Sequence, residues 1–202
     1  SQIRKPGAPL IIGGLMSNMD MRTTVYCYGS PEMALLSAAY TDITKWLGVP
    51  EYETAGCSDA KMFDEQAAME ASINISTAAL IGGNMIHDVG YLEQGLTSSM
   101  EMMVASNEII DRVKRILRGV PVTDETRALD VMNDVGPGGH YLEHDHTYTR
   151  FKTEIWRPTL TDRTNWENWT ESGSKTYRDR VHDRVIEVLE TETEPLMDEK
   201  MF

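Results

Sequence analysis

Three stretches of the chain repeat one pattern of apolar and polar positions. In each stretch a short apolar run is followed by a polar loop and then by a longer segment with helix signals. The apolar runs cover residues 8–14, 51–56 and 84–88, and the helical segments cover 30–46, 64–80 and 98–117. A strand, a loop and a helix in this order are typical of βα units, whose strands form a parallel sheet.

The ends of the expected helices carry residue types that start and stop helices. Ser30 is suited to the N-cap of the first helix, Pro31 to its first position and Gly48 to its end. Asp64 is suited to the N-cap of the second helix, and Gly119 follows the third. These signals predict the boundaries of the helices as well as their existence.

The βα pattern allows two fold classes, an open doubly wound sheet or a (β/α)₈ barrel. Three strands cannot close a barrel, which takes about 250 residues, and the pattern here covers only residues 1–120. The chain also begins at Ser1 without an initiator Met, so we expect it to begin inside a longer protein. We therefore expect an α/β chain that forms part of a larger fold.

Residues 121–202 differ from the first part and predict a helical region. Thr123 is suited to cap a helix that runs to about Asn133. After it we expect a glycine-rich turn, a polar run, a helical turn and a last helix, at residues 135–140, 141–148, 151–156 and 175–190. The acidic tail, residues 191–202, is expected to fray.

The composition argues against several classes of function. The chain has 19 Lys and Arg against 32 Asp and Glu, a net charge of −13, and no basic cluster. Binding to nucleic acid or to an anionic membrane needs concentrated positive charge, so we expect neither. No apolar stretch reaches the ~20 residues of a membrane span. Two cysteines cannot form a disulfide framework, so we expect a protein of the reducing cytoplasm.

Functional groups in parallel α/β folds collect on the loops that follow the carboxyl ends of the strands. We therefore take the candidate residues from three loops. The first loop supplies Tyr26 and Tyr28, the second Cys57 and Asp59, and the third Asp88, Tyr91 and Glu93, with His87 at the end of its strand.

The second loop leaves two interpretations open. Asp59 is suited to orient a ligand or accept a proton, and Cys57 is suited to act as a nucleophile near a helix N-terminus. Alternatively, Asp59 or Ser58 caps the following helix, and Cys57 is unreactive packing.

The third loop brings three ionisable groups close together in sequence. His87 and Asp88 are neighbours in the expected strand, so they should face opposite sides and only one should enter a barrel interior. Glu93 is either a functional carboxylate or a first-turn acid that the dipole of the next helix stabilises.

A cluster of histidines, His140, His144 and His146, suggests a metal site at first sight. Zinc accepts imidazole nitrogens, and Glu143 or Asp145 offers oxygen. The spacing matches no strong zinc motif, however, and the alternative is a polar loop whose histidines cap a helix or form hydrogen bonds. We expect no metal bound by this chain.

Three blocks of sequence, residues 55–61, 84–97 and 134–147, occur together in a recognisable order. They read AGCSDAK, NMIHDVGYLEQGLT and DVGPGGHYLEHDHT. These blocks resemble the C-terminal portion of the trimethylamine methyltransferase family, which includes the glycine betaine:corrinoid methyltransferases. The similarity runs from about Gly7 to about Leu196.

The resemblance implies a (β/α)₈ TIM barrel of roughly twice this length. Residues 1–120 would be its C-terminal βα units, and residues 121–202 a helical region packed on the barrel. The implied reaction, a step of methanogenesis-type one-carbon metabolism, moves a methyl group from a methylated amine to Co(I) of a separate corrinoid protein. The pyrrolysine of the trimethylamine-specific branch is absent here, which favours quaternary amines such as glycine betaine.

A quaternary ammonium substrate suggests roles for the candidate residues. Aromatic faces bind such cations, so we expect them to come from the tyrosines of the loops, with Asp59 and Glu93 as carboxylates. His87 is expected to hydrogen-bond a substrate carboxylate. Catalytic roles are therefore assigned to Asp59, Glu93 and His87, and substrate binding to Tyr91, Tyr26, Tyr28, Asp88 and Cys57.

The expected partners are a corrinoid protein, which carries the cobalamin, a small methylated amine and further copies of this chain. Two other functions stay open. One is a metal-dependent TIM-barrel hydrolase that uses His140, His144 and His146 with Asp88. The other is a betaine- or amine-binding module without turnover.

Overall fold

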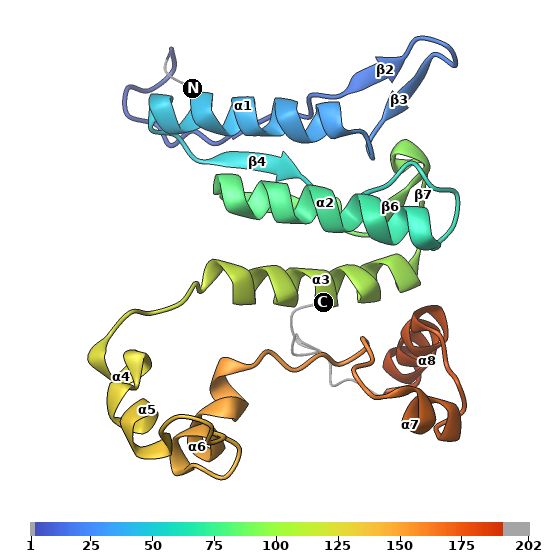
Figure 1. Cartoon of the computed structure of the whole chain (residues 1–202). Coiled ribbons are helices and arrows are strands. Elements are labelled where there is room, and N and C mark those ends of the chain that lie inside the picture. The colour runs from blue at the N-terminus through green and yellow to red at the C-terminus, as the bar shows by residue number, and fades with distance from the viewer. Residues whose placement is uncertain (1–2, 192–202) are drawn as a thin grey trace, which may run out of the picture.

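A three-stranded parallel sheet and the helices that follow its strands organise the first part of the chain (Figure 1). The computed structural model describes residues 3–191, so most of the tail that was expected to fray lies outside the described residues. The sheet has the order β1-β4-β5, with β1 at Ile12–Gly13, β4 at Glu51–Thr54 and β5 at Met85–His87. The expected parallel βα arrangement is therefore present.

The three long helices are α1 (Pro31–Leu47), α2 (Glu65–Ile81) and α3 (Met100–Leu117). They pack side by side in chain order, as Figure 1 shows. Alanines along α2 allow this close packing, because Ala67, Ala71 and Ala78 are almost completely buried in the core. The core cluster thus lies mainly between α2, α3 and the loop that follows β4.

The predicted helix caps are confirmed. The Ser30 side chain accepts a hydrogen bond from the Met33 N–H, and the Asp64 side chain accepts one from the Ala67 N–H. Gly48 ends α1 with φ +68°, a left-handed conformation that favours glycine. Local capping chemistry therefore placed these boundaries correctly.

The two faces of the sheet differ. Glu51 of β4 accepts hydrogen bonds from Thr41 and Thr44 of α1, so its side chain points to the helices. Side chains alternate along a strand, so Tyr52 points to the opposite face. There the edge of the Tyr52 ring meets His87 of β5, with 5.4 Å between ring centroids. Tyr52 is 44% exposed, so this second face is open among residues 3–191.

The first strand is shorter than the apolar run at 8–14 suggested. Ile12 pairs with Glu51, the first residue of β4, and the Ile12 N–H donates to the Pro50 carbonyl. Residues 8–11 therefore lie before the start of the neighbouring strand and have no strand to pair with there. Pairing partners, rather than local hydrophobicity, limit this strand to two residues.

Two antiparallel hairpins occupy loops that were expected to be irregular. The loop after β1 contains β2 (Asn18–Asp20) and β3 (Val25–Cys27). The loop after β5 contains β6 (Tyr91–Leu92), the 3₁₀ turn η1 (Glu93–Gly95) and β7 (Thr97–Ser98). Both hairpins stand at the carboxyl edge of the sheet, next to the candidate residues.

The C-terminal part is helical, as expected, with different boundaries. Its helices are α4 (Asp124–Arg127), α5 (Leu129–Val135), α6 (Asp145–Glu154), α7 (Trp166–Glu171) and α8 (Tyr177–Glu190). The single helix expected from Thr123 is broken at Ala128, which has φ +48°. The helical turn expected at 151–156 begins earlier, because the His144 side chain caps α6 and the helix starts at Asp145.

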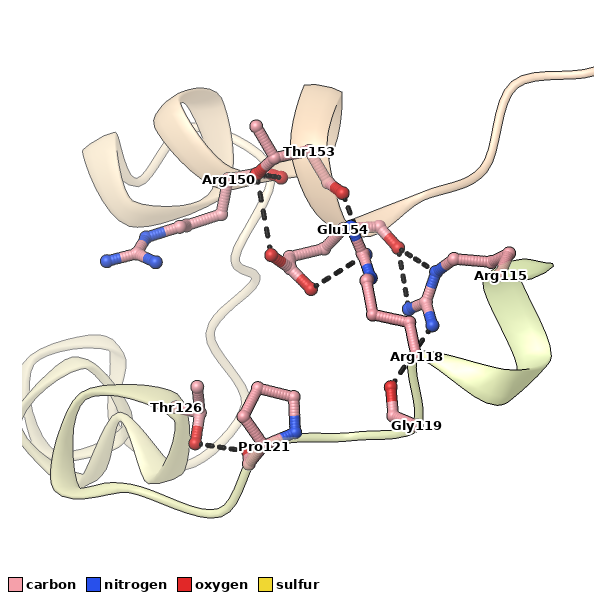
Figure 2. A network of polar contacts seen from close by, with 8 residues as sticks. All are labelled: Arg115, Arg118, Gly119, Pro121, Thr126, Arg150, Thr153 and Glu154. Carbon is pink, nitrogen blue, oxygen red and sulfur yellow. Dashed lines mark hydrogen bonds and ion pairs between the residues drawn. The ribbon is translucent and has the colours of Figure 1, made fainter. Parts of the chain in front are cut away.

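The end of α6 is held against the end of α3 by two arginines (Figure 2). Arg115 Nη2 donates to the Glu154 carbonyl at 2.9 Å, and Arg118 Nη2 donates to the Thr153 carbonyl at 2.9 Å. The last carbonyls of a helix have no partner within the helix, so these guanidinium groups satisfy them. The contact links the two parts of the chain.

A second link joins α8 to α3. Val181 and Val185 of α8 are buried, and Val181 belongs to the same apolar cluster as Met102 and Ala105 of α3.

No helix within residues 3–191 is long and apolar enough to cross a membrane.

Candidate functional site

The loops after β4 and β5 are joined to each other at the carboxyl edge of the sheet. The Ser58 N–H donates to the Tyr91 carbonyl at 3.0 Å, and the Gly90 N–H donates to the Gly56 carbonyl at 2.9 Å. These backbone bonds bring the candidates of the second and third loops to one place, as the parallel topology predicts.

Asp59 joins the first loop to the second. Its Oδ1 accepts a hydrogen bond from the Tyr28 N–H at 2.6 Å, and its Oδ2 accepts one from the Gly29 N–H at 3.0 Å. The expected alternative, in which Asp59 or Ser58 caps the next helix, is wrong because Asp64 is the cap of α2. Both carboxylate oxygens of Asp59 are instead engaged by backbone donors of another loop.

Two polar residues of α2 support this loop, and the sequence analysis missed both. The Glu70 carboxylate accepts from Ser58 Oγ at 2.5 Å and from the Asp59 N–H at 2.8 Å. Asn74 accepts from the Gly56 N–H at 2.7 Å and donates to the Cys57 carbonyl at 2.8 Å. Their spacing of four residues on the alanine-rich face of a helix was the available signal.

Cys57 is completely buried among these groups. Burial raises the pKa of its thiol to about 12, and the negative charges of Asp88, Asp59 and Glu70 act in the same direction. The thiol therefore stays protonated at neutral pH, which favours the packing interpretation of Cys57 over the nucleophile interpretation.

His87 and Asp88 lie on the same side, contrary to the expectation from strand alternation. Asp88 Oδ1 is 2.8 Å from His87 Nδ1, and Asp88 Oδ2 accepts from Thr54 Oγ1 at 3.0 Å. The strand ends at His87, and Asp88 has φ +70°, so the alternation of a strand no longer applies to it. A carboxylate and an imidazole thus meet on the face of the sheet that the helices leave open.

The rings of two candidate tyrosines, Tyr28 and Tyr91, both lie close to Gly95. A Cβ placed on Gly95 would lie 3.5 Å from the Tyr28 ring and 3.8 Å from the Tyr91 ring. Partial burial raises the pKa of Tyr28, and the charges of Cys57, Asp88 and Asp59 and of Tyr26 raise it further. The contacts of Tyr28 with Asp59 and the approach of its ring to Gly95 place it beside the second and third loops.

A backbone hydrogen bond fixes the position of Glu93. Its N–H donates to the Ala60 carbonyl at 2.9 Å, and it opens the turn η1 with φ +48°. The alternative role as a first-turn acid of the next helix is wrong, because α3 begins at Met100. Its half-buried side chain is on the hairpin that carries Tyr91.

The histidine cluster forms local contacts. His144 Nδ1 accepts a hydrogen bond from the His146 N–H at 3.0 Å, and His144 Nε2 lies 3.3 Å from Asp134 Oδ2. Across residues 3–191, no three His, Cys, Asp or Glu side chains are arranged to hold a metal ion. The ligand set of the alternative hydrolase is therefore not assembled in the described part of the chain.

The fold and this loop cluster define an α/β protein whose polar and aromatic groups converge at the carboxyl edge of a parallel sheet. The family model for trimethylamine methyltransferase (MTTB) matches residues 1–202. The chain belongs to this family.

Relatives with assigned functions are similar over nearly the whole chain. Trimethylamine methyltransferase MttB of Desulfitobacterium hafniense is 34% identical over 201 residues, which cover 100% of this chain and 40% of that protein. The enzyme of the same name from Methanosarcina barkeri is 34% identical over 202 residues, 100% of this chain and 41% of the relative. Glycine betaine methyltransferase of D. hafniense is 33% identical over 199 residues, 98% and 41% of the two chains. The chain thus spans about two fifths of the length of these curated relatives.

Proposed function

We propose that this chain is part of a methyltransferase that moves a methyl group from a methylated amine, such as glycine betaine or trimethylamine, to Co(I) of a corrinoid protein. Membership of the family supports the reaction class. The observation that carries the assignment of the site is that the rings of Tyr28 and Tyr91 both approach Gly95, next to Asp88, whose carbonyl accepts the Tyr91 N–H.

This arrangement suits a quaternary ammonium ion. Such a cation binds to the faces of aromatic rings, more strongly where water is excluded. Tyr28 and Tyr91 supply two rings, Tyr26 lies on the adjacent hairpin, and Asp88 and Glu93 supply carboxylates. The net charge of −13 favours the approach of a cationic substrate.

His87 suits the carboxylate end of a betaine. Its Nδ1 lies 2.8 Å from Asp88 Oδ1, so Nε2 is the ring nitrogen that faces away from Asp88 and can meet the carboxylate of the substrate. Its side chain is 44% exposed on the open face of the sheet, so a ligand can reach it. Asp88 holds the ring by its contacts with both His87 and Thr54.

The transfer itself demands positioning more than proton transfer. A corrinoid would serve as the methyl acceptor, supplying in its Co(I) state the electron pair of the new bond to carbon, and the C–N bonding pair would stay on nitrogen. With a quaternary ammonium donor, the leaving group would be a neutral tertiary amine, which needs no proton. The chain must therefore hold the cation with one methyl group exposed in line with the acceptor.

The rest of the barrel would cover the open face of the sheet. We propose that further strands join the free edges of β1 and β5 and close a (β/α)₈ barrel around Tyr52 and His87. Residues 1–120 would then be its C-terminal βα units, and residues 121–202 a helical region packed outside it. This chain covers only 40% and 41% of the length of two curated relatives, which supports the existence of further strands.

The test is a methyl-transfer assay with the complete protein. Cob(I)alamin is mixed with glycine betaine, trimethylamine or related betaines, and the visible spectrum reports formation of methylcobalamin. We expect transfer from a quaternary amine. Tyr91→Phe should retain most activity and Tyr91→Leu should raise KM for the amine about tenfold, since the ring face is lost. Saturable amine binding without methyl transfer, even with the corrinoid partner, would favour the non-catalytic module.

A further inference from the structure

Asp59 is held on two sides, by its carboxylate and by its backbone N–H. Its carboxylate accepts the N–H groups of Tyr28 and Gly29, which belong to the preceding loop. Each oxygen of this carboxylate thus holds one backbone group of that loop. Asp59 can therefore act on a ligand through the loop that it holds, and Tyr28 is the aromatic residue of that contact.

Glu70 holds Asp59 from the opposite side. It is 9% exposed, and it accepts from Ser58 Oγ, from the Asp59 N–H and from Gln66 Nε2 at 2.9 Å. Because Glu70 lies within α2, one rigid helix fixes the loop that fixes Tyr28.

Gly29 shows how closely the parts fit. A Cβ on Gly29 would collide with the Glu70 carboxylate, so only glycine leaves room for this contact. The φ angle of Gly29 lies outside the left-handed region, so the requirement comes from space and not from backbone conformation. The Glu70 carboxylate thus lies against both partners of one hydrogen bond, Asp59 and Gly29.

We propose that Glu70 is a positioning residue that, through Asp59, holds Tyr28 against the amine-binding site. The proposal rests on the proposed function for the identity of the ligand, whereas the link between Glu70 and Tyr28 stands on the contacts alone. Asp59 belongs to the same device, and its role is to place the ring rather than to transfer a proton.

The first experiment reads the position of Tyr28 without any assay of activity. The complete protein is labelled with ¹³Cζ-tyrosine, and the Tyr28 signal is assigned with Tyr28→Phe. In the unaltered protein Tyr28 should titrate above its ordinary pKa of 10.0, because its ring is partly buried near negative groups. Glu70→Ala should move this titration towards 10.0, and Glu70→Gln, which keeps an acceptor for the Asp59 N–H, should restore it.

Matched variants keep the test decisive if Glu70→Ala does not fold. Gly29→Ala places a methyl group against Glu70 and should shift the Tyr28 titration in the same direction. Glu65→Ala, an exposed glutamate of the same helix, should leave Tyr28 unchanged.

Kinetic measurements then test whether the position of Tyr28 affects methyl transfer from the amine. Glu70→Ala should lower kcat/KM for the amine about tenfold, mainly through KM, because a displaced ring binds the cation less well. Glu70→Gln should recover most of the loss. An unchanged Tyr28 titration in folded Glu70→Ala and Gly29→Ala would overturn the inference, whatever the activity. A shifted titration in a protein that binds amine but transfers no methyl group would count against the proposed function and support the positioning role.

Discussion

The Glu108 carboxylate of α3 accepts the Leu160 N–H at 2.6 Å and so ties the C-terminal segment to the third long helix. The same carboxylate accepts the N–H groups of Thr159 at 2.8 Å and Thr161 at 3.1 Å. Only 4% of Glu108 is exposed, so these donors lie where water cannot easily replace their acceptor. One side chain therefore organises a turn that arrives 50 residues later in the chain.

Replacing Glu108 should release this segment. Glu108→Ala leaves several buried N–H groups without an acceptor, and we expect a loss of about 3 kcal/mol in the free energy of unfolding. Glu108→Gln should lose less, because its amide oxygen still accepts. Urea denaturation measures the change, and Asn107→Ala, at an exposed neighbouring position, serves as control. Equal effects of the Ala and Gln variants would contradict the role of the carboxylate as acceptor.

The same contacts predict a dependence on pH. Burial acts to raise the pKa of Glu108, but the hydrogen bonds from Leu160, Thr161 and Thr159 outweigh it and hold the pKa below its ordinary 4.5. A lowered folded-state pKa contributes stability that is complete above 4.5 and is lost as pH falls through the folded-state value. The stability of the unaltered protein should therefore drop in this acid range more than that of Glu108→Gln.

Glu53 should behave in the opposite way. Glu53 is 2% exposed, and its carboxylate oxygens make no well-formed hydrogen bond among the described residues, although the hydroxyls of Ser37 and Thr41 lie near them. Burial raises its pKa, so its ionisation opposes folding as pH rises through the folded-state value. Glu53→Gln should therefore stabilise the protein by about 1–3 kcal/mol at pH 8 and much less at pH 4.

Thermal unfolding at both pH values tests this prediction. Glu65→Gln removes an exposed carboxylate from the first turn of α2 and controls for the change in net charge. A destabilising effect of Glu53→Gln at pH 8 would show that the charged form of Glu53 has a partner that supports the fold.

The two thiols should differ in reactivity. Cys57 is buried and its pKa is raised to about 12, whereas Cys27 is half-buried. Thiolate is the reactive form, so a thiol reagent at pH 8 should modify only Cys27 in the folded protein. Counting modified thiols before and after adding denaturant measures this. Rapid modification of Cys57 in folded Cys27→Ser would contradict its placement in the structure.

The open face of the sheet predicts association of the isolated 202-residue chain. Tyr52 is 44% exposed on that face, and β1 and β5 each leave one edge unpaired among the described residues. Exposed apolar faces and unpaired edges favour pairing with another chain. Light scattering should show dimers or larger species at micromolar concentration, and a stable monomer would argue against a sheet that is open on this side.

Local chemistry in the sequence determined the three βα units and their order. The caps at Ser30 and Asp64 and the stop at Gly48 act through neighbouring backbone groups, so a short stretch of sequence contains all the information needed to place them. The loops that carry the candidates followed from the same units, because parallel strands end at one edge.

The tertiary structure alone decided what the candidate side chains contact. Asp59 meets backbone groups of a loop 30 residues earlier, and Asp88 turns to His87 only because its backbone is left-handed. The support from Glu70 also depends on how α2 packs against two loops. Such contacts join residues that are distant in sequence. Residue type and local spacing could therefore nominate the site, but only the packing of helix, loops and sheet assigned the contacts within it.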